Sequence, residues 1–356
     1  PLIKVASENP GYDVHVFVTG MHMLEKYGAT AREILKEVWN VYLYNNQAFS
    51  SQMEIVLSNT IFGFSHYVKE IKPDLIIIHG DRVEALAGAV VGSFNNIIVA
   101  HIEGGELSGT IDELIRHSVS KMSHIHLVSN KIAKQRLIQL GELEKSIYIL
   151  GSPDLDLMNP NKIPMIIDVK QYYDIKFSHY AIAMFHPVTT EYGSIKEHIK
   201  YFVDALIKSK KNYVVIYPNN DLGSNEILEE YKRLEGNNKI KIYPSLKFEY
   251  FLSLLNHAEY IVGNSSAGIR EAPYYKTPAI DIGTRQKNRF SGKYIFHCDY
   301  DSHSILNAIM LAKNCQADDV EYAFGKGNSD QKFLKILDCE DFWCIDTQKV
   351  FQDLKW

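Results

Sequence analysis

The chain has 356 residues, long enough for about two domains, and its 46% hydrophobic and 23% charged residues are typical of a globular protein. The formal net charge of −5 offers no basic face for a polyanion, which argues against a nucleic-acid partner. The apolar runs are far shorter than the roughly 18 residues that span a bilayer, and no signal peptide is visible, so we expect no association with a membrane.

In the first half of the chain, predicted strands alternate with predicted helices, a pattern typical of parallel sheets covered by helices on both faces. The chain opens inside an apparent helix that already leads into a strand, so we expect a first strand to be missing from the chain as given. The helix predicted at 51–72 separates the next two strands. The strands are expected at 13–20, 74–80, 97–103, 125–129 and 146–151.

A segment rich in Pro, Asn and Asp at 151–164 interrupts this pattern, which then restarts. A helix at 194–210 has apolar residues at helical spacing. Strands are expected at 180–187, 212–220, 239–245, 259–266 and 277–284. We therefore predict an α/β fold with two doubly wound, Rossmann-like domains facing a cleft, with ligands at the carboxyl ends of the strands.

The predicted boundary lies near residues 155–170. The first Rossmann-like domain is expected to span residues 1–160 and the second, which would bind the nucleotide, residues 165–330. We expect residues 331–356 to form a helical tail that packs back on the first domain. The four cysteines all lie in the last sixty residues, and none forms a CxxC pair: Cys298, Cys315, Cys339 and Cys344. This pattern favours a reducing, cytoplasmic compartment, and we predict neither a metal nor a cofactor.

Two neighbouring predicted strands of the first half end in acidic residues. Asp81 follows the strand at 74–80, and Glu103 closes the strand at 97–103. Carboxylates at the carboxyl ends of parallel strands lie where ligands bind, and the glycines beside them allow close approach of the backbone. The alternative is that both are solvated loop acids; their occurrence on adjacent strands favours a site.

The sequence "SGTIDELIRH" (108–117) then begins a helix. Thr110 followed by Glu113 three residues later predicts a capping box, which gives Glu113 a structural role. Asp112 lies in the first turn, with Arg116 four residues later. Asp112 is thus either a site residue or a helix-dipole acid paired with Arg116.

In the second half, "GNSSAGIREA" (263–272) follows a strand and leads into a helix. Its small residues, among them Ser265, Ser266 and Gly268, predict an anion site suited to a diphosphate, with a plain helix cap as the alternative. The lysine of a Walker loop is absent. Glu271 is a candidate to accept ribose hydroxyls or is a solvated helix acid.

Two further segments carry candidates. Arg285 and Arg289 in "GTRQKNRF" are either phosphate contacts or surface charges. His186 follows a strand and precedes a proline, a place from which its ring faces the predicted cleft. This position favours a site residue over a structural histidine.

Taken together, the segments resemble the UDP-N-acetylglucosamine 2-epimerases in order and approximate spacing, over residues 1–335. The motif "EGGELSGTIDE" resembles the hydrolysing branch, which serves sialic acid synthesis, and differs from the "EAGLRSG/TG"-like segment of the non-hydrolysing branch. The other matching segments are "HGDRVEALAGA", "FHPVTTE", "PNNDLGS", "GNSSAGIREA" and "IGTRQKNR". The loop that follows the family's first strand and contacts the nucleotide sugar has no counterpart here.

The resemblance implies a glycosyltransferase-B fold, a UDP-sugar substrate, no cofactor, and a homodimer or homotetramer. It implies that four residues act in or near catalysis: Asp81, Glu103, Asp112 and His186. It also implies nucleotide or sugar contacts from Arg82, Arg116, Asp221, Ser265, Ser266, Glu271 and Arg285.

The implied reaction converts UDP-N-acetylglucosamine and water to N-acetylmannosamine and UDP, by elimination to a 2-acetamidoglucal and hydration. We hypothesise Glu103 or Asp112 as the acid/base of the hydration half, and Asp81 as a positioning group or base. Two related activities stay open: a 2-epimerase acting on UDP-N,N′-diacetylbacillosamine, and a retaining glycosyltransferase, which would not explain "EGGELSGTIDE". A non-catalytic nucleotide-sugar binding module is the alternative of a different class.

Overall fold

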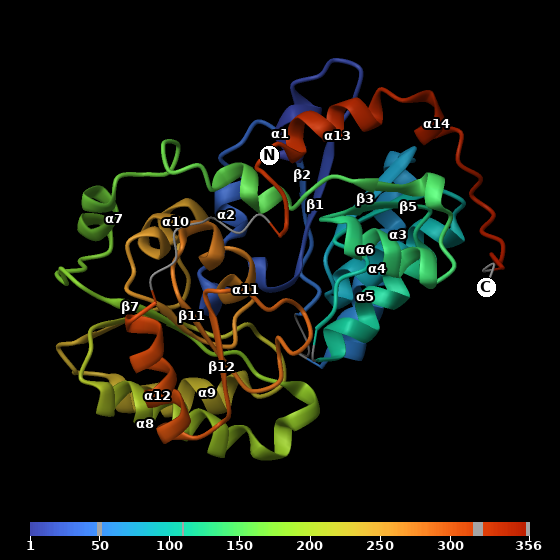
Figure 1. The fold of residues 1–356 in the computed structure, drawn as a ribbon. Helices are drawn as coiled ribbons and strands as arrows, with labels where there is room; N and C mark the ends of the chain where they lie inside the picture. Colours follow the sequence, from blue (N-terminus) through green and yellow to red (C-terminus); the bar gives the residue numbers. More distant parts are fainter. Residues whose placement is uncertain (48–51, 109, 316–322, 354–356) are drawn as a thin grey trace.

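The computed structural model describes residues 1–47, 52–108, 110–315 and 323–353. Its helices and strands alternate along most of the chain, as the sequence predicts (Figure 1). The strands are β1 (His15–Val18), β2 (Asn40–Leu43), β3 (Leu75–His79), β4 (Ile98–Ile102), β5 (Ile125–Val128), β6 (Ile147–Ile149), β7 (Ala181–Met184), β8 (Tyr213–Ile216), β9 (Ile240–Tyr243), β10 (Ile261–Gly263), β11 (Ala279–Ile282) and β12 (Ile295–Cys298).

The longest helices are α3 and α8, which lie within the predicted ranges. The α-helices are α1 (Leu2–Ser7), α2 (Ala31–Ile34), α3 (Met53–Ile71), α4 (Val83–Phe94), α5 (Ile111–Met122), α6 (Lys131–Gln139), α7 (Ile166–Tyr172), α8 (Ile195–Ser209), α9 (Ser224–Tyr231), α10 (Phe248–Asn256), α11 (Ala267–Arg270), α12 (Ser302–Lys313), α13 (Ser329–Leu337) and α14 (Glu340–Trp343). None of the helices in the described residues could cross a membrane.

The strands form three parallel sheets. β1 pairs with β2, the order β3-β4-β5-β6 makes a four-stranded sheet, and the remaining six strands make the order β12-β11-β10-β7-β8-β9. The two larger sheets lie on either side of the predicted domain boundary. All ten predicted strands are confirmed; β2 and β12, most of whose residues are half-buried or exposed, were not predicted.

The six-stranded sheet has the strand order of a Rossmann fold: strands are added on one side from β7 to β9 and on the other side from β10 to β12, so the order of addition reverses between the parallel neighbours β7 and β10. Ligands bind at such a switch point because the loops leaving the two strands diverge there. Gly263 ends β10 with φ +142°, and a Cβ at this position would overlap the carbonyl oxygen of Met184 on β7. Only glycine fits there, so the two strands that flank the switch point can approach closely.

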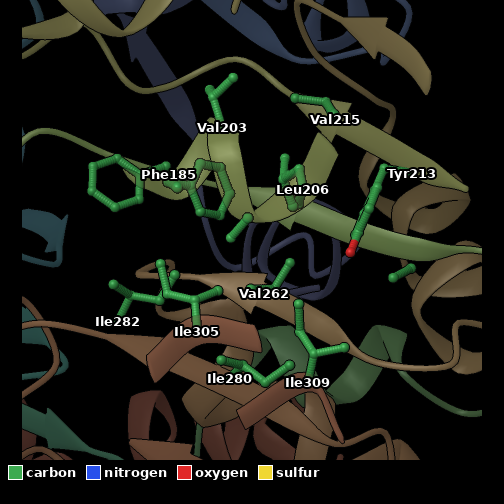
Figure 2. Packing of buried hydrophobic residues seen from close by; sticks show 14 of the residues in the cluster. Phe185, Val203, Leu206, Tyr213, Val215, Val262, Ile280, Ile282, Ile305 and Ile309 are labelled. Carbon is green, nitrogen blue, oxygen red and sulfur yellow. The ribbon is translucent and has the colours of Figure 1, made fainter. Parts of the chain in front are cut away.

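Helices cover both faces of the six-stranded sheet. On one face, α8, α9 and α12 pack on the strands through apolar side chains such as Val203, Leu206 and Ile305, which belong to one cluster with Val215 and Val262 of the strands (Figure 2). On the other face a second cluster joins α7, α10 and α11 to the same strands. Apolar burial on both faces explains why these strands read as continuous apolar runs in the sequence.

The four-stranded sheet is covered on both faces as well, but its two layers come from distant parts of the chain. Helices α3, α4 and α5 pack on Ile76, Ile78 and Val99. The opposite face packs against α1 and against α13 and α14, and its cluster contains Leu2 and Phe333. In Figure 1 the red helix α13 lies beside the blue helix α1, although more than 300 residues separate them. The first half therefore buries one face of its sheet against the end of the chain.

Candidate active site

A cavity of about 190 Å³ lies where the carboxyl ends of the four-stranded sheet meet loops of the second half. Asp81 follows β3, Glu103 follows β4, and Asp112 lies in the first turn of α5. Its walls are almost entirely polar, and its lining residues are Asp81, Glu103, Ser108, Asp112, Asp154, Ser266, Arg270, Glu271, Arg285, Gln286 and Arg289. The structure thus brings the three carboxylates predicted from the first half together with groups of the second.

Asp81 is bonded to the fully buried guanidinium of Arg116, which comes from the middle of α5. Arg116 also donates to the carbonyl of Glu106 and to Ser108 Oγ, each at 3.3 Å. Burial and three nearby guanidinium groups lower the pKa of Arg116. The loop that carries Asp81 is fixed from its other side by His101, whose Nε2 lies 2.8 Å from the carbonyl oxygen of Gly80. Asp81 is therefore held in place by its pairing with a buried guanidinium.

Glu103 is buried and has φ +71°, an unusual backbone conformation for a glutamate. Its Oε1 is bonded to Arg270 and lies 3.1 Å from Nε2 of His79. Burial by itself would raise the pKa of Glu103, but Arg270 and His79 hold that pKa well below its ordinary value. Glu103 is thus ionised, and in the described part of the chain both cationic partners contact Oε1 and none contacts Oε2.

Asp112 is held more loosely than the other two carboxylates. Its backbone N–H donates to Thr110 Oγ1 at 3.2 Å, and its Oδ2 lies 3.4 Å from Nη2 of Arg285. The Asp112–Arg116 pair considered above is wrong, because Arg116 is engaged by Asp81 and Asp112 turns across the cavity to Arg285. A carboxylate with one long contact is free to exchange partners when a ligand enters.

The predicted capping box at the start of α5 is wrong in its partners. Thr110 is the N-cap, but it accepts from the N–H of Asp112 and not from that of Glu113. Glu113 Oε2 accepts from the N–H of Ser108, two residues before the cap, at 2.9 Å. Glu113 nevertheless keeps a structural role, because this bond closes the loop that leads into α5.

Four arginines surround the carboxylates: Arg116, Arg270, Arg285 and Arg289. Arg289 pairs with the buried Glu106 at 2.9 Å, and Arg270 pairs with Glu106 at 3.6 Å. The Nε atoms of Arg285 and Arg289 are buried and have no hydrogen-bond partner among the described residues. Guanidinium groups match the geometry of phosphate oxygens, so this cluster is suited to an anionic leaving group.

Glu271 differs from Glu103, because its pKa is raised and not lowered. Burial raises the pKa of Glu271 to about 8, with further contributions from Asp154 and Glu103, while Arg270 opposes the shift. Glu271 lines the cavity, and its buried Oε2 accepts no hydrogen bond within the described part of the chain. A buried carboxyl with an unused oxygen is suited to bind a hydroxyl group of a ligand.

His186 and Asn264 mark the switch point of the six-stranded sheet. The side chain of Asn264 accepts from the N–H of His186 at 2.6 Å and donates to its carbonyl at 2.8 Å. His186 Nδ1 accepts from the N–H of Asn219 at 3.0 Å, which places any ring proton on Nε2. Burial, followed by Arg285 and Arg82, holds the pKa of His186 well below its ordinary value. The ring is neutral and lies outside the set of residues that line the main cavity.

A smaller cavity lies beside the first, and at this cavity Arg82 connects the two halves of the chain. Nη2 of Arg82 donates to Asn220 Oδ1 at 2.9 Å and to Asp221 Oδ1 at 3.2 Å. Arg82, Asp112 and Asp221 all line this second cavity. The predicted contact residues Arg82 and Asp221 therefore lie together, bound to each other across the two halves.

The predicted anion turn after β10 is only partly available to a ligand. Ser266 lines the main cavity, whereas Ser265 Oγ accepts from the N–H of Ala267 at 3.3 Å. The N–H of Gly268 donates to the carbonyl of Ser265, and a Cβ on Gly268 would lie 3.3 Å from that of Ala279. In this structure Gly268 serves close helix–sheet packing, and its predicted part in substrate binding stays a prediction.

Sequence reasoning did not predict roles for His79, Glu106, Arg270 and Asn264. Arg270 and Asn264 lie inside "GNSSAGIREA", so their place in a candidate motif was a usable signal. Glu106 had no expected task, because its partners Arg270 and Arg289 come from the other half of the chain. Such partners cannot be inferred from local spacing.

The model of the family described as UDP-N-acetylglucosamine 2-epimerase matches residues 4–338. The chain belongs to the UDP-N-acetylglucosamine 2-epimerase family. It is 47% identical over 358 residues to the UDP-N-acetylglucosamine 2-epimerase of Neisseria meningitidis, covering 99% of this chain and 95% of that protein. It is 30% identical over 343 residues to the UDP-N,N′-diacetylbacillosamine 2-epimerase (hydrolyzing) of Legionella pneumophila, covering 94% of this chain and 90% of that protein. Membership identifies the chain as an enzyme.

Solved structures of 2-epimerases share the fold. A Neisseria meningitidis UDP-GlcNAc 2-epimerase bound to UDP-GlcNAc superposes with a TM-score of 0.77 at 16% identity, covering 94% of this chain and 95% of that one. The Methanocaldococcus jannaschii 2-epimerase in complex with UDP-GlcNAc and UDP gives 0.73 at 19% identity, covering 91% and 99%. The predicted fold class is confirmed: two Rossmann-like parallel sheets in a glycosyltransferase-B arrangement.

Proposed function

We propose that this 2-epimerase is of the hydrolysing type and converts UDP-N-acetylglucosamine and water to N-acetylmannosamine and UDP. The observation that carries the proposal is one polar cavity in which three carboxylates of the first half face arginines of the second. Such an arrangement can take a proton from a sugar ring on one side and hold a departing diphosphate on the other.

The chemistry requires both functions at once. The hydrogen at C2 is not adjacent to a carbonyl, so its removal becomes feasible only as the bond from C1 to the UDP oxygen breaks. Loss of the C2 proton and of UDP leaves a 2-acetamidoglucal. Water then adds across this double bond, with hydroxide bonding to C1 and a proton to the opposite face of C2. The released sugar is the 2-epimer, and UDP carries away the electron pair of the broken bond.

The surroundings of each carboxylate favour different roles. Glu103 is ionised, and both of its side-chain partners among the described residues contact Oε1, which suits a base that works through Oε2. Asp112 has one long contact, to Arg285, and would be released when that arginine binds phosphate, which suits a second acid/base group. Asp81 is bound to Arg116 and suits a positioning group.

Arg285 and Arg289 would hold the diphosphate, with Ser266 beside them, because both guanidinium groups line the cavity and their Nε atoms have no partner among the described residues. Glu271 would bind a hydroxyl of the ligand. His186 is neutral, lies beside Arg82 and Arg285, and would donate from Nε2. The remaining predicted contact residues, Arg82 and Asp221, line the smaller cavity and would contact the nucleotide sugar from there.

The names of relatives support the hydrolysing type and also a second substrate. Two relatives named as hydrolyzing act, by their names, on N,N′-diacetylbacillosamine nucleotides: the Legionella pneumophila protein at 30% identity and a Campylobacter jejuni protein at 36% over 293 residues, covering 78% of this chain and 74% of that protein. The relative at 47% identity is named for UDP-N-acetylglucosamine. Its name therefore favours UDP-N-acetylglucosamine, the sugar with the smaller substituent at C4, as the substrate of this chain.

The experiment is incubation with each of the two UDP-sugars in heavy water, followed by NMR. Release of free 2-epimerised sugar and UDP, with deuterium at C2, is the expected result for UDP-N-acetylglucosamine. A UDP-linked epimer in reversible equilibrium would assign the non-hydrolysing type instead. UDP binding without turnover would identify a non-catalytic binding module.

The roles of Glu103 and Asp112 are tested in the same assay. Glu103→Gln and Asp112→Asn are each expected to lower kcat by at least about 100-fold, the usual contribution of a general acid or base. The exposed Glu235→Gln is the matched control and should keep normal turnover. Near-normal kcat in both site variants would overturn the assignment.

A further inference from the structure

The contact between His79 and Glu103 joins a solvent-exposed ring to a buried carboxylate. His79 is the last residue of β3, and its side chain is 45% exposed, whereas that of Glu103 is 9% exposed. The imidazole Nε2 lies 3.1 Å from Oε1 of the carboxylate. No hydrogen bond to Nδ1 of His79 is found among the residues that the structure describes, so the far side of the ring is open.

The reaction proposed above creates a need for such a link. When Glu103 takes a proton, from C2 or from the attacking water, that proton must leave before the next turnover. Glu103 is buried, and its other partner is Arg270, a guanidinium that stays protonated at all working pH values. Of the two side chains that contact Glu103 in the described part of the chain, the exposed imidazole is therefore the one that can exchange protons with bulk water.

We propose that His79 carries protons between Glu103 and solvent, as a relay for the acid/base step. The proposal rests on the proposed function, because it assumes that Glu103 exchanges a proton during turnover. In the resting site His79 is an imidazolium that donates to the Glu103 carboxylate. After Glu103 is protonated, His79 gives one proton to water and is left as the neutral imidazole that carries its hydrogen on Nδ1, so that the bare Nε2 accepts the Glu103 proton. One proton enters at Glu103, one leaves from His79 to water, and the resting imidazolium–carboxylate pair is restored.

The charges around His79 support this order of events. Partial loss of hydration by the half-exposed ring lowers the pKa of His79, but ionised Glu103, and to a smaller extent Asp154, raise it above its ordinary value. Arg270 acts in the opposite direction, and the neighbouring His101 is neutral because burial lowers its pKa to about 3. Once Glu103 is neutralised, the main cause of the raised pKa is gone, so the imidazolium releases its proton when the relay requires it.

The test uses His79→Ala and His79→Gln in the full chain, with the UDP-sugar that the wild-type protein turns over. We expect kcat to fall by about 100-fold in both variants, with KM changed less than threefold, because the ring moves protons and does not hold the substrate. Adding imidazole should restore the rate of His79→Ala in proportion to its concentration. A series of substituted imidazoles should restore it according to their pKa values, which a structural role would not produce.

The matched control is His297→Ala. His297 is likewise a half-exposed histidine paired with a buried carboxylate, Asp281, at 2.8 Å, but it lies on β12 away from the cavity. Its kcat should be unchanged and insensitive to imidazole. An unchanged kcat in His79→Gln, or a loss in His79→Ala that folded protein retains at every imidazole concentration, would overturn the relay. Failure of the wild-type protein to release free sugar would instead overturn the proposed function.

Discussion

At the scale of single residues, the acids of the site differ because their partners differ. Asp81 is neutralised by a buried arginine, and Glu103 by an arginine and a histidine. Glu271 is buried without such a bond, and burial raises its pKa to about 8. The same side-chain chemistry thus yields carboxyl groups with lowered and with raised pKa values within one cavity. A sequence shows the acids but not these partners.

We predict that Arg116→Met lowers the free energy of unfolding by about 3 kcal/mol, because it leaves Asp81 unpaired and removes a buried cation from the α5 side of the cavity. The control is Arg32→Met, which breaks an exposed pair with Glu25 and should cost less than about 1 kcal/mol. Urea denaturation measures both. If both variants lost the same free energy of unfolding, burial would not make the Asp81–Arg116 pair more stabilising than an exposed pair.

We also predict that Gly263→Ala destabilises the protein by at least about 3 kcal/mol, because a Cβ would overlap the Met184 carbonyl and φ is in the region that favours glycine. Gly193→Ala is the matched control, since a Cβ there would meet open space. Thermal unfolding is the measurement. Similar melting temperatures for both variants would contradict the account of the switch point given above.

At the scale of elements, α5 connects local helix chemistry to the site. Its first turn carries Asp112 and its second Arg116, so its starting point sets the position of both side chains. Thr110 caps that first turn, and Glu113 fastens the preceding loop through the N–H of Ser108. Small changes at this cap therefore affect both stability and the geometry of the cavity.

Thr110→Ala is expected to lower the free energy of unfolding by about 1 kcal/mol, the usual cost of losing an N-cap acceptor. It should lower kcat as well, because the first turn then frays beside Asp112. Thr110→Ser retains the hydroxyl and should restore both values. Denaturation together with steady-state kinetics checks this, and loss of activity in Thr110→Ser would point to the methyl group instead of the cap.

The elements themselves were largely predictable, whereas their partners were not. Strands such as β4 and β8 are buried on both faces, so apolar runs identify them, while β2 and β12 carry half-exposed positions and escape such a search. The carboxylates were found because strand ends and a helix start predict a shared edge. Arg270 and Glu106 were not, because their pairing depends on how the two halves meet.

At the scale of the whole molecule, a buried polar network joins the end of the chain to its first half. Lys349 donates to Ser123 O at 2.6 Å and to Glu142 Oε2 at 2.5 Å. Glu142 also lies 2.8 Å from Lys121 and 3.0 Å from His126 Nε2. The final segment is thereby bound to the carboxyl end of α5, the helix that carries Asp112 at its other end.

This network predicts a sensitivity to acid. Burial would raise the pKa of Glu142, but His126, Lys349 and Lys121 lower it to about 2, below the ordinary 4.5. Its stabilising contribution is therefore fully present above pH about 4.5 and is lost as the pH falls toward 2. Glu142→Gln should be less stable than wild type at neutral pH and should lose less stability over that acid range.

Urea denaturation at several pH values measures the effect, with the exposed Glu249→Gln as the control variant. The control should follow the wild-type curve throughout. Parallel pH curves for wild type and Glu142→Gln would show that this carboxylate does not contribute to acid lability.

The packing of α13 and α14 on the four-stranded sheet has a consequence for synthesis of the chain. Phe333, Leu337 and Phe342 belong to the same apolar cluster as Ile98 and Leu127. A ribosome makes the strands some two hundred residues before the helices that cover them. During translation one face of the first sheet is therefore an uncovered apolar surface, so we expect the nascent first half to depend on chaperones until the last helices emerge.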